Sequence, residues 1–292
     1  MSEPAAIDQR LLGRFPLPRV AEASSKEDRG RLLVIAGSRE LAGAALLAGV
    51  AGLRAGAGKL QIATAASLSV ALAVAVPEAR VIGYPETEDG CIDESGIEPL
   101  IGWARDAQAV AIGCGLKHGP PLETLCSRLL QSEAAAPLIL DAAILDCLEP
   151  LEREVRRWSG GLILLPHAGE MASLLGCEED EVEADPIGCG RTCADRYGAV
   201  VLVKGVQSHV VSPGGEVWRY AGGGPGLGVS GSGDVLAGTV GGLLARGAAP
   251  LDALLWAVWA HGEAGRILGE KVGPLGFLAR EIAGEVPALL AN

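Results

Sequence analysis

Short apolar runs alternate with helix-like patterns along most of the chain. Arg31–Gly37 and Val200–Lys204 are compact runs rich in Val, Leu and Ile, as expected of buried strands. Ala44–Ala55 carries alanines and glycines that would let a helix pack closely on a sheet. The other strands predicted in this way are Lys59–Thr64, Val81–Tyr84, Val110–Gly113, Leu138–Asp141 and Leu162–Leu165.

The two ends of the chain have different patterns. Residues 1–27 mix prolines with charges, which predicts an N-terminal arm before the first strand of the sheet at Arg31. Alternating segments on either side of Pro213–Gly215 predict an antiparallel hairpin, and Leu251–Leu268 predicts a long helix. Because no repeat, low-complexity tract or linker divides the chain, we expect one domain over residues 1–292.

This alternation of strands and helices predicts the fold class. It favours a three-layer α/β fold, with a mostly parallel central sheet and helices on both faces. Ligands of such sheets bind beyond the carboxyl ends of the strands. The residues that follow apolar runs, and so fall at those ends, are Ser38, Gly115, Asp141, His167, Lys204 and Asp234.

The glycine-rich stretch Gly222–Leu244 points to a phosphate site. Its first thirteen residues hold seven glycines and one proline, so the backbone can turn sharply and approach a bulky ligand. A helical apolar pattern begins after Asp234. The amides and dipole of a helix start favour a phosphate, and a carboxylate beside it is expected to handle a proton or a cation.

Other interpretations of this stretch are a simple tight turn and an Asp that only complements the helix dipole. No Gly-Lys-Ser or Gly-Lys-Thr follows the loop, and the dinucleotide fingerprint does not follow a leading strand here. A phosphate-binding fold of another kind is therefore needed.

Three polar residues near strand ends have competing interpretations. His167 fits either a hydrogen-bonded helix start or a ligand contact, and Glu170 fits either a capping box or a magnesium ion held through water. Lys204 ends a very apolar strand, where a cation is costly unless it is paired or faces a phosphate, which favours function. The cationic residues interpreted as structural or solvated are Lys117, His118, His209 and His261.

Composition limits the possible binding partners and the cellular compartment of the protein. A net charge of -12 over 292 residues argues against nucleic acid or an anionic membrane as the main partner. The start of the chain lacks the basic and apolar regions of a signal peptide, and no apolar run reaches the length of a membrane span, so a cytoplasmic protein is expected. The seven cysteines are scattered and are expected to be reduced thiols without a function.

With these motifs in place, the chain resembles the ADP-dependent NAD(P)H-hydrate dehydratases, a branch of the ribokinase-like fold. The resemblance spans about Lys26 to Leu244. Its motifs, in order, are GSRELAGAALLA (Gly37–Ala48), GAGKLQIAT (Gly56–Thr64), PEARV (Pro77–Val81), AIGCGL (Ala111–Leu116), LILDA (Leu138–Ala142), PHAGEM (Pro166–Met171), VLVKG (Val201–Gly205) and GPGLGVSGSGDVLAG (Gly224–Gly238).

The resemblance implies a repair reaction in which hydrated NADH or NADPH is dehydrated while ADP, or ATP, supplies a phosphoryl group. It also implies a magnesium ion, with Glu170 as a candidate contact through water, and a homotetramer. It places Asp234 at the reacting hydroxyl as the catalytic base. The other residues it assigns are Ala44, Gly115 and His167 at the hydrate, and Lys204, Gly205, Val206, Gln207, Ser208 and Gly233 at the nucleotide.

The chain departs from the family's usual motifs at several positions. The usual DADAL is DAAIL at Asp141–Leu145, so the second acid is replaced by Ala143, and the usual GPGLG is GCGLK with Cys114 and Lys117 changed. The family commonly has an asparagine before a Pro-Gly-Met segment, and this chain has Gly224 at that position. These changes leave two alternatives open: an alcohol kinase of the same fold, similar to thiazole or pyrimidine kinases, and a nucleotide-binding protein without turnover. The HxGE form of the PHAGEM motif favours the dehydratase over the kinases' NxxE.

Overall fold

The structure, a computed structural model, describes residues 3–19 and 25–291. Its strands are β1 (Ala5–Ala6), β2 (Arg31–Ile35), β3 (Lys59–Ala65), β4 (Ala79–Tyr84), β5 (Ala109–Ile112), β6 (Leu138–Leu140), β7 (Leu162–Leu164), β8 (Val200–Val203), β9 (Ser208–Val211) and β10 (Val217–Tyr220). Its α-helices are α1 (Gln9–Leu12), α2 (Ala42–Arg54), α3 (Ala66–Ala75), α4 (Ile97–Asp106), α5 (Pro120–Leu130), α6 (Glu152–Arg157), α7 (Ala168–Leu175), α8 (Glu179–Ala184), α9 (Pro186–Tyr197), α10 (Ser232–Ala245), α11 (Pro250–Lys271) and α12 (Ala279–Leu290). Four short 3-10 helices are η1 (Glu94–Gly96), η2 (Ala142–Cys147), η3 (Glu149–Leu151) and η4 (Pro225–Leu227).

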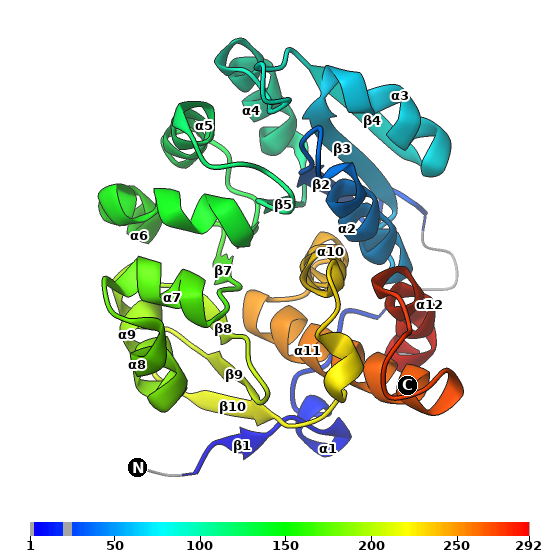
Figure 1. Ribbon diagram of the computed structural model, residues 1–292, viewed down its shortest axis with the longest axis vertical. Coiled ribbons are helices and arrows are strands. Elements are labelled where there is room, and N and C mark those ends of the chain that lie inside the picture. Colours follow the sequence, from blue (N-terminus) through cyan, green and yellow to red (C-terminus); the bar gives the residue numbers. More distant parts are fainter. Residues whose placement is uncertain (1–2, 20–24, 292) are drawn as a thin grey trace.

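One mixed sheet runs through the molecule in the order β1-β10-β9-β8-β7-β6-β5-β2-β3-β4 (Figure 1). All neighbours from β8 to β4 are parallel, whereas β9 is antiparallel to both β8 and β10. The hairpin predicted around Pro213–Gly215 is therefore confirmed as β9 and β10, with Val211 opposite Val217. The predicted three-layer, mostly parallel α/β fold is also confirmed.

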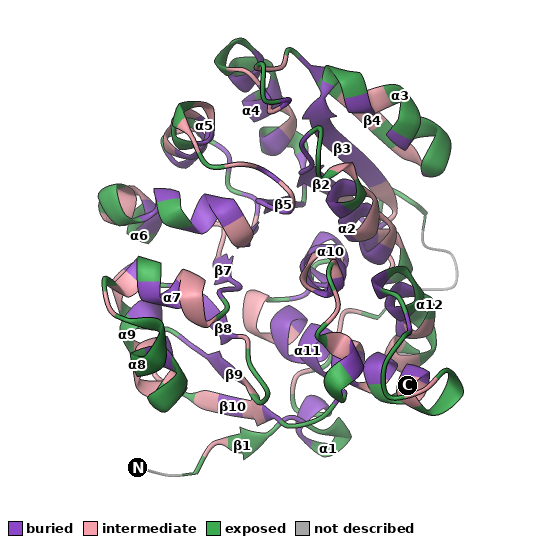
Figure 2. Cartoon of the chain, in the orientation of Figure 1, coloured by how far each residue is buried: buried purple, intermediate pink, exposed green. Residues whose placement is uncertain are grey.

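Helices cover both faces of the sheet and bury two large cores against it (Figure 2). One core includes Ala45 of α2, Val240 of α10 and Leu254 of α11, all fully buried. The other includes Leu100 of α4 and Leu125 of α5. Small residues matter where α10 meets α2, because a Cβ on Gly238 would lie only 2.0 Å from the carbonyl oxygen of Ala48.

The N-terminal arm contributes to the sheet, which differs from the expectation that the sheet begins at Arg31. β1 pairs in parallel with β10 and adds an edge strand, and Leu12 of α1 is fully buried in the core. A two-residue strand is too short to show an alternating pattern, so the sequence gives no signal for it. Part of the predicted arm, residues 20–24, lies outside the described residues.

The strand order reverses between β2 and β5. From β2 the chain builds outward through β3 and β4, then returns to add β5 on the other side of β2 and continues through β6 to β8. The loops after β2 and β5 meet there, and Gly37 N donates to the carbonyl oxygen of Cys114 at 2.9 Å. A crevice at such a switch point is the usual ligand site of open α/β sheets.

None of the helices within residues 3–19 and 25–291 is long and apolar enough to cross a membrane.

Candidate functional site

The glycine loop delivers Asp234 to the first turn of α10, as the sequence predicts. Gly231, just before the helix, has φ 90°, a left-handed conformation that favours glycine. A Cβ on Gly233 would lie 3.8 Å from Asp141 Oδ2 and 3.9 Å from Lys204 Nζ. The helix start, with its free amides, therefore faces a buried carboxylate and a lysine.

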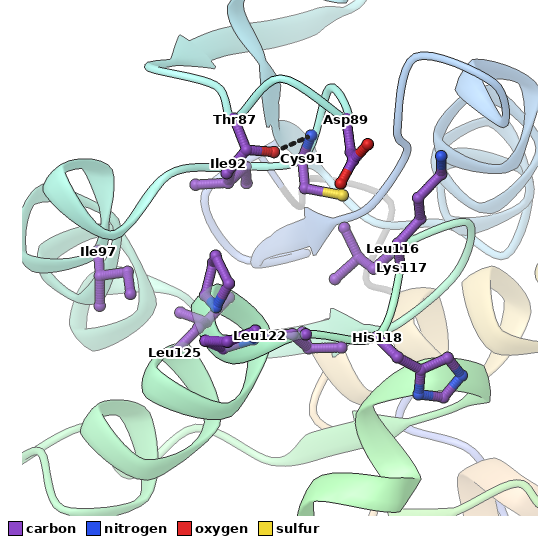
Figure 3. Close-up of a pocket in the computed structure, with 13 residues that line it drawn as sticks. Thr87, Asp89, Cys91, Ile92, Ile97, Leu116, Lys117, His118, Leu122 and Leu125 are labelled. Atoms are coloured by element: carbon purple, nitrogen blue, oxygen red, sulfur yellow. Dashed lines mark hydrogen bonds between the residues drawn. The ribbon is translucent and has the colours of Figure 1, made fainter.

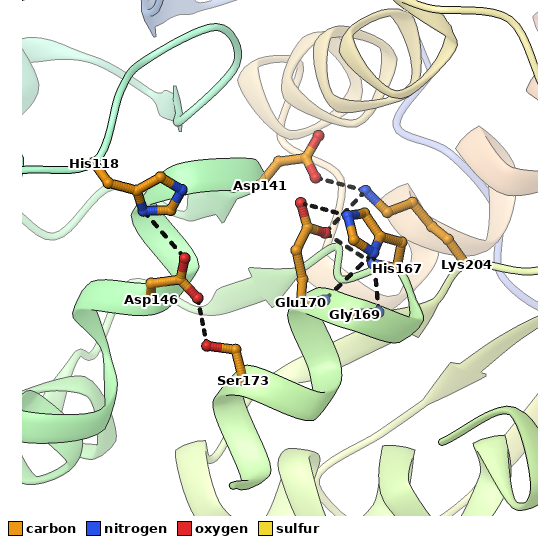
Figure 4. A network of polar contacts seen from close by, with 8 residues as sticks. All are labelled: His118, Asp141, Asp146, His167, Gly169, Glu170, Ser173 and Lys204. Atoms are coloured by element: carbon orange, nitrogen blue, oxygen red, sulfur yellow. Dashed lines mark hydrogen bonds and ion pairs between the residues drawn. The ribbon is translucent and has the colours of Figure 1, made fainter. Parts of the chain in front are cut away.

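Lys204 and Asp141 form the central ion pair of this region (Figure 4). Lys204 follows β8, and its Nζ lies 2.7 Å from Asp141 Oδ1 and 3.6 Å from Glu170 Oε2. Although burial lowers the pKa of Lys204, the charges of Asp141 and Glu170 outweigh burial and raise that pKa above its usual value. The lysine thus stays cationic at the end of an apolar strand, where an incoming phosphate can reach it.

The backbone around Asp141 is unusual. Ala142, directly after it, has φ 56° and is the one non-glycine residue in the described chain with a positive φ. A Cβ on Gly113 of the neighbouring strand end would lie 1.7 Å from the carbonyl oxygen of Asp141, so only glycine fits there. Strain of this kind persists where the surrounding structure fixes it, and here it lies directly next to the residue that pairs with Lys204.

His167 and Glu170 form a reciprocal cap at the start of α7 (Figure 4). His167 Nδ1 accepts from Gly169 N at 3.1 Å and from Glu170 N at 3.3 Å, while Glu170 Oε2 accepts from His167 N at 2.8 Å. Since Nδ1 accepts, the ring proton is on Nε2, which lies 3.3 Å from Glu170 Oε1. The capping-box interpretation of Glu170 is confirmed, and the His167 side chain remains 58% exposed and open to a ligand.

Asp234 has the electrostatics of a general base. Burial is the main cause that raises its pKa from 3.8 to about 6, the charge of Asp141 adds to the increase, and the Cys114 thiol and Lys204 oppose it. A carboxylate with this pKa is ionised at neutral pH but binds a proton far more readily than an ordinary Asp. Such a group can take the proton of a hydroxyl.

A cavity of about 1030 Å³ opens beside this helix start. Its walls include the whole predicted nucleotide segment Lys204–Ser208 together with Gly233, and Val206 is fully exposed there. His167, which the resemblance assigns to the hydrate, also lines this cavity. The other polar residues on its walls are Ser232, Tyr220 and His261.

Ala44 and Gly115 lie together on the other side of α10, at the switch point. A Cβ on Gly115 would lie 2.7 Å from the Ala44 Cβ, and Leu47, one turn along α2, lies against Gly231 at the start of α10. Neither Ala44 nor Gly115 lines the large cavity. The segment Lys204–Ser208 therefore lines the large cavity, whereas the Ala44–Gly115 contact lies outside it.

Comparison with known proteins shows to which family the chain belongs. The model of the NAD(P)H-hydrate dehydratase family matches residues 32–288. The chain belongs to this family. The resemblance drawn from the motifs is therefore confirmed.

Individual relatives carry the same family name. The ADP-dependent (S)-NAD(P)H-hydrate dehydratase of Xanthomonas campestris pv. campestris is 44% identical over 277 residues, covering 94% of this chain and 92% of the relative. The protein of that name from Neisseria meningitidis serogroup B is 34% identical, covering 92% and 88%. Other relatives are longer: the chain spans 52% of the bifunctional NAD(P)H-hydrate repair enzyme of Moorella thermoacetica, to which it is 33% identical.

The fold also matches a solved member of the NAD(P)H-hydrate dehydratase family. The ADP/ATP-dependent enzyme of Bacillus subtilis, co-crystallised with ATP and Mg²⁺, superimposes with a TM-score of 0.83 at 28% identity, covering 100% of this chain and 99% of that one. A hydroxyethylthiazole kinase of Pyrococcus horikoshii has a TM-score of 0.58 at 20% identity and shows a shared fold alone.

Three residues at this candidate site have no catalytic or binding role in the sequence analysis. Asp141 appears there only as an acid at a strand end, and the Cys114 thiol, buried beside Asp234, is given no function. His261 has the structural role that the sequence analysis allows: its Nε2 lies 3.1 Å from the carbonyl oxygen and 3.0 Å from Oγ of Ser232 in the glycine loop. Burial lowers the pKa of His261 to about 4, so the ring is neutral and fastens the loop to α11. No local signal reveals this contact, because 29 residues separate the two partners.

A magnesium ion would have few protein ligands here. Throughout the described chain, no three His, Cys, Asp or Glu side chains lie together as a metal-binding group. Glu170 offers one carboxylate, already engaged by His167 N. Mg²⁺ commonly keeps its waters and binds one or two carboxylates together with substrate phosphates, so this donor set fits an ion that arrives with the nucleotide.

Proposed function

We propose that this chain dehydrates hydrated NADH or NADPH back to the reduced dinucleotide, using ADP or ATP as the phosphoryl donor. The family and the names of the relatives agree with the reaction that the motifs predict. The observation that carries the proposal is Asp234, a carboxylate of pKa about 6 at a phosphate-favouring helix start next to Lys204. A base and an anion site are thereby placed where a hydroxyl can meet a phosphoryl group.

Asp234 supplies a base, and Lys204 and the start of α10 supply positive charge for the phosphoryl group. Asp234 takes the proton of the hydrate hydroxyl as its oxygen attacks the terminal phosphorus of ADP, which breaks the bond to AMP. Lys204 and the amides at the start of α10 stabilise the charge on the transferring phosphoryl group. The ring nitrogen then expels phosphate from the ring carbon, and loss of a neighbouring ring proton restores the reduced nicotinamide.

The remaining residues orient the two substrates. We assign Gly205–Ser208 and Gly233 to the nucleotide, because they line the large cavity together with Lys204. We assign Ala44 and Gly115 to the hydrate because they meet at the switch point, and His167 to the hydrate on the family resemblance, at the wall of the large cavity. A Mg²⁺ held through water by Glu170 would neutralise phosphate charge when bound.

The broader properties of the protein complete this proposal. We propose a single domain over residues 1–292, a homotetramer and a cytoplasmic location. Light scattering tests the assembly: a mass near that of one 29.7 kDa chain would contradict the tetramer. Coincident loss of near- and far-ultraviolet dichroism on heating tests the single domain.

The test of the function is a reconstituted reaction. Purified protein, magnesium and ADP or ATP are mixed with hydrated NADH, and the absorbance of reduced nicotinamide is followed. Return of that absorbance only with nucleotide supports the dehydratase. A stable phosphate ester of the substrate would indicate a kinase, and bound nucleotide without consumption would indicate a binding protein.

A further inference from the structure

A second, smaller cavity lies close to the switch point (Figure 3). It has a volume of about 150 Å³ and opens between the loop after β4, which carries Thr87–Ile92, and the loop after β5, which carries Leu116–Pro121. Both loops are at carboxyl ends of parallel strands, on the side of the sheet where ligands bind. The cavity therefore belongs to the ligand-binding edge of the sheet, apart from the nucleotide cavity.

This second cavity is connected to the proposed hydrate site through one short segment. Gly115 contacts Ala44 at the switch point, and the next residue, Leu116, already lines the cavity. His118, also on its wall, lies 3.1 Å from Asp146 through Nδ1, and Asp146 accepts from Ser173 of α7 at 2.7 Å. Figure 4 shows these side chains beside the cluster of Asp141, Glu170 and Lys204.

The proposed reaction requires a place for the far half of a dinucleotide. The nicotinamide end of the hydrate must reach Asp234 while ADP occupies the large cavity lined by Lys204–Ser208. ADP in that cavity would compete with the adenosine half of the hydrate for the same walls. The Ala44–Gly115 side offers the adenosine half a separate course, because Leu116 and the second cavity follow directly.

The walls of the second cavity match an adenosine group. Ile92, Ile97 and Leu125 provide an apolar surface for a flat base. Asp89 can accept a hydrogen bond from a ribose hydroxyl or from the amino group of the base. Lys117 stands at the rim, where a phosphate of the dinucleotide would pass (Figure 3).

Lys117 is available to a phosphate. Its Nζ lies 2.8 Å from Glu40 Oε2, but the Glu40 side chain is 73% exposed. An exposed ion pair contributes little, so a phosphate, which carries more charge than the carboxylate, can displace Glu40. We propose that this second cavity, between the loops after β4 and β5, binds the adenosine half of the hydrated dinucleotide, with Lys117 contacting the phosphate of that half. This inference rests on the proposed function.

The kinetic test replaces Lys117 by Gln. The KM for hydrated NADH or NADPH should rise about 10-fold, the change expected for one charged hydrogen bond, while kcat and the KM for ADP stay unchanged. Lys271→Gln is the control, because Lys271 is also a lysine paired with one glutamate, Glu285, at 2.9 Å. An unchanged KM for the hydrate in Lys117→Gln, or an equal rise in the control, would overturn the inference.

A truncated substrate separates the cavity from the chemistry. The hydrate of reduced nicotinamide mononucleotide lacks the adenosine half, so its KM should be the same for the parent and for Lys117→Gln. It should also exceed the KM of the full hydrate in the parent. If the parent used both hydrates with equal KM, the cavity would hold no part of the substrate.

A binding measurement keeps this inference apart from the proposed function. With the nucleotide cavity saturated by AMP, NADPH should bind the parent more tightly than Lys117→Gln by calorimetry. If the parent dehydrates no hydrate but this difference is found, the proposed function fails and the adenosine site stands. If the parent is active and the two proteins bind NADPH equally, the site fails and the function stands.

Discussion

Replacing Asp234 by Asn should make the protein more stable at pH 8 and inactive. The folded pKa of Asp234, about 6, lies above its ordinary value of 3.8, mainly because the carboxylate is partly buried. A raised carboxyl pKa means that the folded state prefers the protonated acid. Asp234 therefore destabilises the fold increasingly as pH rises from about 4 through about 6, and the full penalty is present above pH 6.

The size of this penalty follows from the shift in pKa. A change from 3.8 to about 6 is about 2 units, which corresponds to about 3 kcal/mol of unfolding free energy. Asp234 is only partly buried, so solvent screening lowers the effect to about 1–2 kcal/mol. Asn is neutral and of similar size, so removing the charge should raise the unfolding free energy by about 1–2 kcal/mol at pH 8.

The assay is urea denaturation of parent and variant at pH 8 and at pH 4.5. The Asn variant should be more stable by about 1–2 kcal/mol at pH 8, and the difference should shrink at pH 4.5, where the parent's Asp234 is protonated. Asp195→Asn, which removes the same charge from an exposed site on α9, is the control and should give no such gain. A less stable Asp234→Asn variant at pH 8, or a gain independent of pH, would refute this reasoning.

Three further predictions follow from the site. Recovery of reduced nicotinamide should be half-maximal near pH 6 and fall about 10-fold per unit below it as Asp234 takes up a proton; a rate that stays flat to pH 5 would exclude Asp234 as the base. Lys204→Gln should weaken AMP binding by at least about 10-fold in calorimetry, whereas Lys271→Gln should not, and equal affinity in all three proteins would remove Lys204 from the nucleotide site. His167→Ala should lower hydrate use and should also lower stability by about 1 kcal/mol, because the α7 cap is lost. His167→Asn should keep the cap and the melting temperature but still use the hydrate poorly. Full hydrate use by the Asn variant would show that His167 is a capping residue only.

Much of the fold could be predicted because its central strands are short, buried and apolar. Such runs stand out in the sequence, and β2 and β8 begin at the predicted residues, Arg31 and Val200. Several helices, α3 and α12 among them, are not among the elements predicted from the sequence. α3, for example, is a run of small and apolar residues with no side-chain cap at either end, and α12 contains Pro287.

The candidate site could be predicted only in part. Asp234 and Lys204 carry local signals: a glycine loop before a helix, and a lysine after an apolar strand. Gly205–Ser208 were predicted only through the family resemblance. The pairing of Lys204 with Asp141 joins residues 63 positions apart, and it depends on β6 and β8 ending at the same edge of the sheet. Contacts of this kind come from the strand order, which the pattern of apolar residues does not contain.

The most direct test of the central claim is the stoichiometry of a single reaction. Hydrated NADH is incubated with ADP, magnesium and the purified protein, and AMP, inorganic phosphate and NADH are measured in the same sample. If phosphoryl transfer to the hydroxyl drives dehydration, the three products form in equal amounts, and Asp234→Asn forms none of them. Formation of AMP together with a phosphorylated hydrate and no NADH, or recovery of NADH without AMP, would contradict the mechanism.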